Sequence, residues 1–196
     1  MRPHAATQNA NRPEGSQIGR PTELDRHFRA AGAHSTEDPV RIADRQRMVA
    51  MRNLNDPSCR GEMIERVQAL RSDSAGRWGK MSVDQMLWHV SDALALALGE
   101  LSVPPTKPPL PRGLLKFMIL NLPWGKNAPT MPQLVAKQRY DFETERTRCL
   151  RLIDRVASMD IAAEWPAHPM LGRMSGSEVG RLQAKHLHHH LTQFGV

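Results

Sequence analysis

The C-terminal segment from Ser175 to Val196 constrains the fold more than any other part of the sequence. Ser175 and Glu178 form an S-x-x-E capping box, so the segment is predicted to be one helix that begins near Ser175. At 100° per residue, one line along this helix carries Val179, Gln183, His186 and His190. We expect this line to be buried, which requires other helices to pack over it.

The four histidines of this segment are not equivalent. His186 and His190 lie on the buried line, one helical turn apart. His188 points almost opposite, toward water, and His189 lies on the shoulder, where a modest rotation of the helix would bring it inward. Unpaired buried imidazoles cost roughly a few kcal/mol each, and a divalent metal ion supplies a partner for them. The alternative is a solvated stripe of histidines, because an H-x-x-x-H pattern on its own lacks a third ligand.

Three further helical patterns precede the histidine segment. The first is marked by Met63, Ile64, Val67 and Leu70. The second opens at the capping box of residues 82–85, runs to about Gly99 and has a core stripe of Val83, Leu87, Val90, Leu94 and Leu98. The third is predicted to have Pro132 in its first turn, followed by the stripe Val135, Gln138, Phe142, Glu145, Cys149, Leu152 and Val156. The polar members of this last stripe either orient a metal ligand or face an exposed edge.

The segment between the second and third helices is rich in proline. Val103–Pro111 cannot be helical, and Gly113–Leu122 is a short apolar piece, expected to cover the helices or to form a subunit contact. His168 lies in a later loop and is interpreted as structural. Four helical patterns without an alternating strand predict an all-α fold for residues 39–196. Its predicted form is a four-helix bundle with a long proline-rich crossover between helices 2 and 3.

His89 lies on the shoulder of the second helix, where it can reach a groove between packed helices. A lone histidine there can simply bond to a backbone carbonyl or to water. Beside His186 and His190, however, it completes a mononuclear metal site of three neutral imidazoles. A ferritin-type di-iron site is not expected, because no helix carries a Glu-x-x-His pair. Asp92 and Glu145 are candidates for orienting a histidine or accepting a proton, and catalytic residues remain unassigned.

Composition limits the remaining alternatives. The net charge of +7 comes mostly from arginines spread along the chain, which argues against a nucleic-acid partner because such a partner requires a concentrated basic face. Cys59 and Cys149 form no C-x-x-C motif, which favours a cytoplasmic setting without a disulfide framework. No apolar stretch is long enough to span a membrane. Residues 1–38 hold few aliphatic side chains and are predicted to form a flexible N-terminal arm.

The chain resembles the DinB superfamily, and most closely an uncharacterised branch of it. The resemblance covers about residues 50–196 and leaves the N-terminal arm unexplained. Four stretches carry it, namely residues 77–89 with the sequence RWGKMS and QMLWH, residues 122–130, residues 168–172 and residues 185–196.

The resemblance implies a metal-binding four-helix bundle that is often a homodimer. Its ligand pattern, one histidine on the second helix and H-x-x-x-H on the fourth, falls on His89, His186 and His190. The superfamily includes thiol S-transferases, which implies a small-molecule or thiol substrate and a metal-dependent transferase or hydrolase. The expected cofactor is a divalent ion, Zn²⁺ or Ni²⁺, with Fe or Mn as further options. The alternative is a noncatalytic metal-binding structural or stress-response module.

Overall fold

The computed structural model describes residues 52–126 and 128–196, and within them the chain is all-helical. The α-helices are α3 (Pro57–Gln68), α4 (Val83–Ala97), α5 (Arg112–Asn121), α6 (Phe142–Ser158) and α7 (Gly176–Gln193). A single 3₁₀ turn, η1 (Pro132–Leu134), lies between α5 and α6. The described ranges contain no β-strand, so the all-α part of the predicted fold class is confirmed. The predicted arm of residues 1–38 lies outside the described residues.

Side-chain caps explain where the long helices begin. At α7 the capping box is complete, because Glu178 Oε2 accepts from Ser175 N at 2.9 Å and Ser175 Oγ accepts from Glu178 N at 3.2 Å. Asp56 caps α3 by accepting from the backbone N–H of Ser58 at 2.8 Å. The predicted start of the histidine helix is therefore confirmed.

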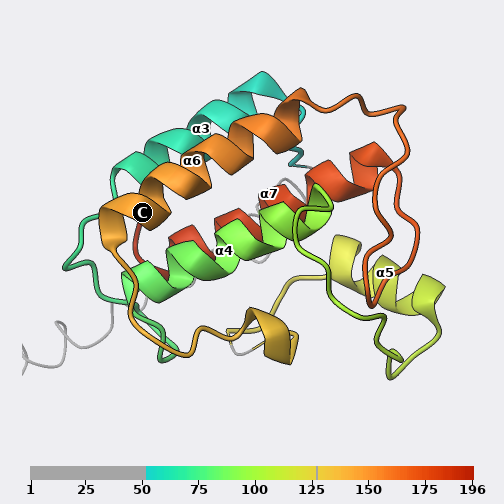
Figure 1. The fold of residues 1–196 in the computed structure, drawn as a ribbon, viewed down its shortest axis with the longest axis horizontal. Helices are drawn as coiled ribbons and strands as arrows, with labels where there is room; N and C mark the ends of the chain where they lie inside the picture. The colour runs from blue at the N-terminus through green and yellow to red at the C-terminus, as the bar shows by residue number, and fades with distance from the viewer. Residues whose placement is uncertain (1–51, 127) are drawn as a thin grey trace, which may run out of the picture. The chain divides into compact units, whose positions relative to one another are not determined.

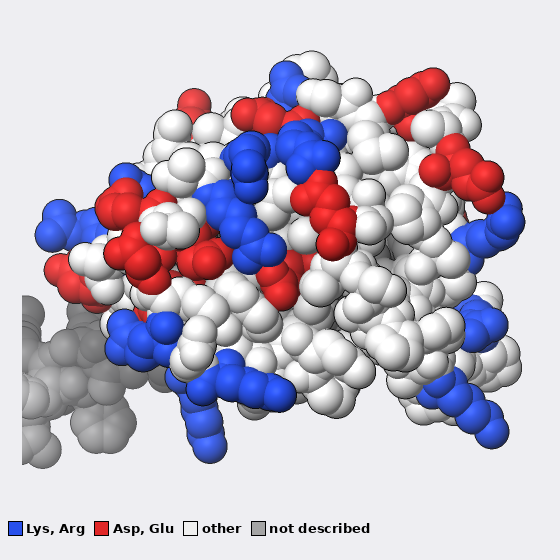
Figure 2. Space-filling view, viewed as in Figure 1, with Lys and Arg blue, Asp and Glu red and all other residues white. Residues whose placement is uncertain are grey.

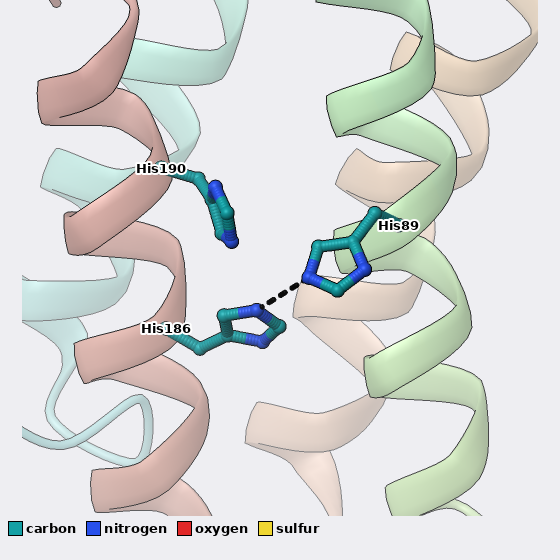
Figure 3. Close-up of side chains that lie close together, drawn as sticks. All are labelled: His89, His186 and His190. Atoms are coloured by element: carbon teal, nitrogen blue, oxygen red, sulfur yellow. Dashed lines mark hydrogen bonds between the residues drawn. The ribbon is translucent and has the colours of Figure 1, made fainter. Parts of the chain in front are cut away.

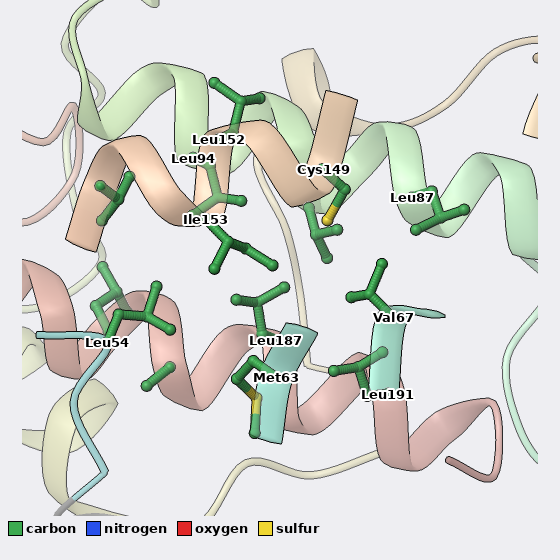
Figure 4. Close-up of a cluster of buried hydrophobic side chains, with 14 of the residues drawn as sticks. Leu54, Met63, Val67, Leu87, Leu94, Cys149, Leu152, Ile153, Leu187 and Leu191 are labelled. Atoms are coloured by element: carbon green, nitrogen blue, oxygen red, sulfur yellow. The ribbon is translucent and has the colours of Figure 1, made fainter. Parts of the chain in front are cut away.

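Four of the helices contact one another in a closed order, α3 to α6 to α4 to α7 and back to α3 (Figure 1). Their apolar stripes meet in one core, shown in Figure 4, which includes Met63, Val67, Leu87, Leu94, Leu152, Ile153, Leu187 and Leu191. Removal of these side chains from water is the main stabilising contribution to the packing. No helix in the described ranges is both long and apolar enough to cross a bilayer.

The crossover between α4 and α6 adds a fifth α-helix, so the predicted count of four is wrong. The apolar piece expected there forms α5, which packs against α7 (Figure 1). Lys185 of α7 fixes the end of α5, because its Nζ donates to the carbonyl oxygens of Ile119 at 2.6 Å and Leu122 at 2.5 Å. These carbonyls lack partners within α5, and an ammonium group compensates them favourably.

The predicted start of the third helix at Pro132 is also wrong. Pro132 opens only η1, and α6 begins at Phe142 after the N-cap Asp141. The carboxylate of Asp84 holds the chain just before α6, accepting from Arg139 Nε at 3.0 Å and from the Tyr140 backbone N–H at 2.8 Å. This tertiary anchor competes with continuation of the helix toward Pro132. As a result, Val135 and Gln138 are exposed instead of lying on a buried stripe.

Candidate functional site

Three histidine rings converge between α4 and α7 (Figure 3). His89 extends from α4, and His186 and His190 extend from α7. The Nε2 atoms of His89 and His186 are 2.9 Å apart, and one nitrogen from each of the three rings lies within 4.8 Å of the others. Each pair of ring centroids is 4.9 Å apart. The structure thus brings together the three residues that the sequence singled out.

Two of these rings are fixed from behind by oxygen acceptors. The Nδ1 of His89 lies 2.7 Å from the carbonyl oxygen of Leu134, and the Nδ1 of His190 lies 2.8 Å from Gln193 Oε1. A carbonyl oxygen only accepts, so each Nδ1 carries the proton and donates. Each neutral ring consequently keeps its lone pair on Nε2, on the side where the rings meet.

The position of Gln193 is itself fixed by the backbone before α4. Its Nε2 donates to the carbonyl oxygen of Trp78 at 2.7 Å, which leaves Oε1 to face His190. The next residue, Gly79, has a φ of 80°, and a Cβ there would lie 2.6 Å from Gln193 Nε2. Only glycine therefore permits this approach without displacing the amide that holds His190.

Burial keeps the three rings neutral. It lowers the pKa of His89, although the bond to Leu134 opposes this effect. It lowers the pKa of His190 to about 3, with a further contribution from His89, and it holds the pKa of His186 well below the ordinary value. Neutral imidazole is the form that binds a metal ion, so no proton has to leave the rings at neutral pH.

The donor set fits a single transition-metal ion. Zn²⁺ with imidazole nitrogens at about 2.0–2.1 Å in a tetrahedron places those nitrogens about 3.4 Å apart. The three nitrogens here, with one pair at 2.9 Å and all pairs within 4.8 Å, bracket that separation. Three neutral nitrogen donors without a carboxylate suit Zn²⁺, Ni²⁺ or Fe²⁺ and do not suit Ca²⁺ or Mg²⁺, which take oxygen ligands.

His188 does not face water as the helical phase predicted. Its Nδ1 lies 2.8 Å from Nη1 of Arg66 in α3 and 3.4 Å from Nη1 of Arg52, which precedes α3, and both contacts are half-buried. A guanidinium group only donates, so the His188 lone pair is taken up by arginine. Burial and the neighbouring Arg66 lower the pKa of His188 to about 4. The prediction failed because α3 covers the side of α7 that the isolated helix would expose.

His189 lies beside the three-histidine group but outside it. Its ring centroid is 5.0 Å from that of His190, 5.7 Å from Trp124 and 5.9 Å from Trp78. The rotation that would exchange it for a neighbouring ligand is not seen, because the indoles hold it on the shoulder of α7. It is thus an aromatic neighbour of the group.

The two acidic candidates are engaged elsewhere. Arg148 of α6 bridges them, with Nη2 at 2.6 Å from Asp92 Oδ1 and Nη1 at 3.3 Å from Glu145 Oε2. The role expected of them, orienting a histidine, is taken by Leu134 and Gln193 instead. Gln193 had a signal in the sequence, since it lies three residues after His190 and hence on a neighbouring face. The Leu134 carbonyl had no signal in the sequence, because every residue has a backbone carbonyl.

His168 has the structural role that the sequence predicted. Its Nδ1 accepts from the backbone N–H groups of Met170 and Leu171, each at 3.2 Å. Its own backbone N–H donates to Gly172 O at 2.9 Å and its carbonyl accepts from Gly172 N at 2.8 Å. The ring therefore closes the loop that leads into α7.

Comparison with known proteins identifies a family but assigns no activity. Residues 51–195 match the family described as protein of unknown function DUF1569. No curated protein and no solved structure matches the chain significantly. The matched range includes the five described helices and the three histidines.

Proposed function

We propose that this chain, which belongs to the DUF1569 family, binds one divalent metal ion between His89 of α4 and His186 and His190 of α7. The observation that carries the proposal is the arrangement of both nitrogens on each anchored ring. Nδ1 donates to an oxygen behind the ring while Nε2 faces the other rings. Metal-binding histidines in proteins are typically oriented in this way. A hydrogen bond between the His89 and His186 rings would by itself not require the oxygen acceptors behind His89 and His190.

The proposal extends to the fold. In our interpretation α3, α4, α6 and α7 are the four helices of a DinB-like bundle, with α5 and η1 inserted in its crossover. Two features support this interpretation: the closed order of contacts among the four helices, and the pattern of one histidine from the second and two from the fourth. A cytoplasmic homodimer is part of the same expectation.

The function best supported is that of a metal-dependent transferase or hydrolase that acts on a small molecule, such as a thiol. His89, His186 and His190 would hold the ion, which would supply Lewis-acid chemistry and would lower the pKa of a water or thiol bound to it. The chain supplies three neutral donors, fixes the rings and excludes most of the solvent. His89 and His190 are 3 % and 8 % exposed, while His186 is partly exposed.

A second candidate is a structural metal site. The site joins α4 to α7, which are far apart in the sequence, so a bound ion would cross-link the domain. The partial exposure of His186 favours the first candidate, because a purely structural site has no need of solvent access. A nucleic-acid function is not favoured, since acidic and basic side chains alternate over α3 and α6 on the face in Figure 2.

Metal analysis of protein purified without an affinity tag tests the proposal. We expect about one equivalent of a transition metal per chain, lost in His186→Ala and retained in His188→Ala. A water exchangeable by anions, detected by the visible spectrum of Co²⁺-loaded protein, would favour catalysis over a structural role. Wild-type protein that takes up no Zn²⁺, Ni²⁺, Fe²⁺ or Co²⁺ in titration would overturn the metal site.

A further inference from the structure

His186 is the member of the three-histidine group that a molecule from solvent would meet first. It is the partly exposed member of the group, and the ring of Trp124 lies beside it with centroids 5.8 Å apart. Trp124 is held in place by its Nε1, which donates to Ile119 O at 2.9 Å, and by Lys185, whose Nζ lies 5.3 Å from the ring centroid. A molecule that approaches His186 therefore passes a fixed indole face.

A second indole, that of Trp78, also lies beside the His189 ring. Trp78 and Trp124 lie 5.9 Å and 5.7 Å from the His189 ring. The Nε1 of Trp78 is buried and has no hydrogen-bond acceptor within the described part of the chain. An unpaired buried N–H is unfavourable, and an acceptor on a bound molecule would remove that cost.

The charge near these indoles has one sign. Lys126 is exposed, and its Nζ lies 5.5 Å from the Trp78 ring centroid without pairing to a described carboxylate. Between residues 101 and 140 the sequence holds no Asp or Glu and six cationic residues, namely Lys107, Arg112, Lys116, Lys126, Lys137 and Arg139. In Figure 2 the lower part of the face carries basic side chains and no acidic ones. Lys116 and Arg139 pair with Glu178 and Asp84, so within the described residues Lys126 is the cation of this segment that lies beside an indole and attracts anions.

We propose that the site takes a small anionic molecule with a flat apolar body, such as an aromatic carboxylate. The body packs on Trp124 and Trp78, and the anionic group lies toward Lys126 and the Trp78 N–H. The remaining end reaches the three-histidine group past His186. This inference rests on the proposed metal site and adds its substrate class.

Two observations select this ligand over a neutral or cationic one. An indole face without a charge would accept any flat molecule, but the ammonium of Lys126 and the N–H of Trp78 are both donors and favour an acceptor. Asp92 of α4 and Glu145 of α6 are paired with Arg148. A cation would therefore meet no free carboxylate among these groups.

The test uses full-length Co²⁺-loaded protein titrated with benzoate and with its neutral analogue benzamide. Binding is followed by the visible bands of Co²⁺ and by tryptophan fluorescence. We expect benzoate to bind at least tenfold more tightly than benzamide, with an affinity that falls as salt is raised. The Lys126→Gln variant should weaken benzoate binding about three- to fivefold and leave benzamide unchanged.

Two further variants separate charge from geometry. Trp78→Phe keeps a ring and removes the N–H, so it should weaken benzoate about two- to tenfold without loss of Co²⁺. Lys107→Gln is the matched control, because Lys107 is a lysine of the same crossover that lines a separate surface groove formed by residues 105–112. It should bind benzoate like the wild type.

The outcomes distinguish the two proposals. If wild-type protein takes up no Co²⁺, the metal site itself is wrong. If Co²⁺ binds and is lost in His186→Ala, but benzoate and benzamide bind equally, only the substrate class is overturned. Equal benzoate affinities of Lys126→Gln and Lys107→Gln would likewise exclude Lys126 from the site.

Discussion

The two sides of α7 use histidine in opposite ways. Toward α4, His186 and His190 meet His89, and one nitrogen of each ring lies within 4.8 Å of the others. Toward α3, His188 meets Arg66 at 2.8 Å, and its lone pair is occupied by a donor. Burial lowers the pKa on both sides, so burial does not distinguish a candidate ligand from a structural histidine. The groups that the ring nitrogens face make that distinction.

Arg66 shows why the α3 side is structural. Besides His188, its guanidinium donates to Thr192 Oγ1 at 3.1 Å and to Val196 O at 2.6 Å, and it lies 3.4 Å from the Glu62 carboxylate. These bonds fasten the last turn of α7 to α3. A metal ion near His188 would have to displace a cation, which Coulomb repulsion opposes.

Loss of a ligand on the α4 side should have the largest effect. His186→Ala or His190→Ala should lower metal affinity at least a hundredfold, because the remaining two imidazoles cannot hold the ion in a tetrahedron. His188→Ala, on the other side of the same helix, should retain affinity within about threefold. Isothermal titration with Zn²⁺ measures these affinities. Equal losses in His188→Ala and His186→Ala would show that the α3 and α4 sides of α7 do not differ in metal binding.

Chelation should have the next largest effect. An ion that binds the native state alone stabilises it by RT ln(1 + [L]/Kd), or about 2.7 kcal/mol at a hundredfold excess over Kd. We therefore expect a chelator to lower the Tm of the wild type by several degrees. His89→Ala leaves a buried gap and lowers the Tm by itself, so the informative quantity is the chelator-induced shift. That shift should nearly vanish in His89→Ala and persist in His188→Ala.

Removing the acceptor behind a ligand should have a smaller effect. Gln193→Leu deletes the oxygen that accepts from His190 Nδ1, and we expect metal affinity to fall about tenfold. Gln193→Glu keeps an oxygen acceptor in place and should restore most of that loss. Competition with a chromophoric chelator measures the difference. Identical affinities of Gln193→Leu and the wild type would show that the bond does not orient the ring.

The smallest effect is expected for the pH dependence of stability that comes from His188, on the α3 side of α7. The pKa of His188 is lowered to about 4, so the unfolded chain binds more protons than the native one below the ordinary histidine pKa of about 6.5. The contribution of His188 to the free energy of unfolding is therefore fully present above about pH 6.5 and is lost as the pH falls toward 4. In chelator-treated protein, His188→Gln should make this decrease shallower than in the wild type, as followed by urea unfolding between pH 7 and 5. An unchanged slope would show that His188 is not held neutral by α3.

Local sequence determined much of this molecule. The capping box at Ser175 and the apolar stripes fixed where α4 and α7 lie, because caps and 3.6-residue periodicity act within a few turns of chain. The same periodicity placed His186 and His190 on one buried line and His89 on a neighbouring helix, and these three rings do come together.

Tertiary structure decided the rest, because the decisive contacts join segments far apart in the sequence. The start of α6 depends on Asp84 holding Arg139 and Tyr140, which overrides the helical pattern that begins at Pro132. The environment of His188 depends on α3, which a helical projection does not contain. The acceptor behind His89 is a backbone carbonyl, a group common to all residues, so only the path of the crossover selects Leu134. Sequence periodicity placed the rings on helix faces, whereas long-range packing determined what each ring nitrogen meets.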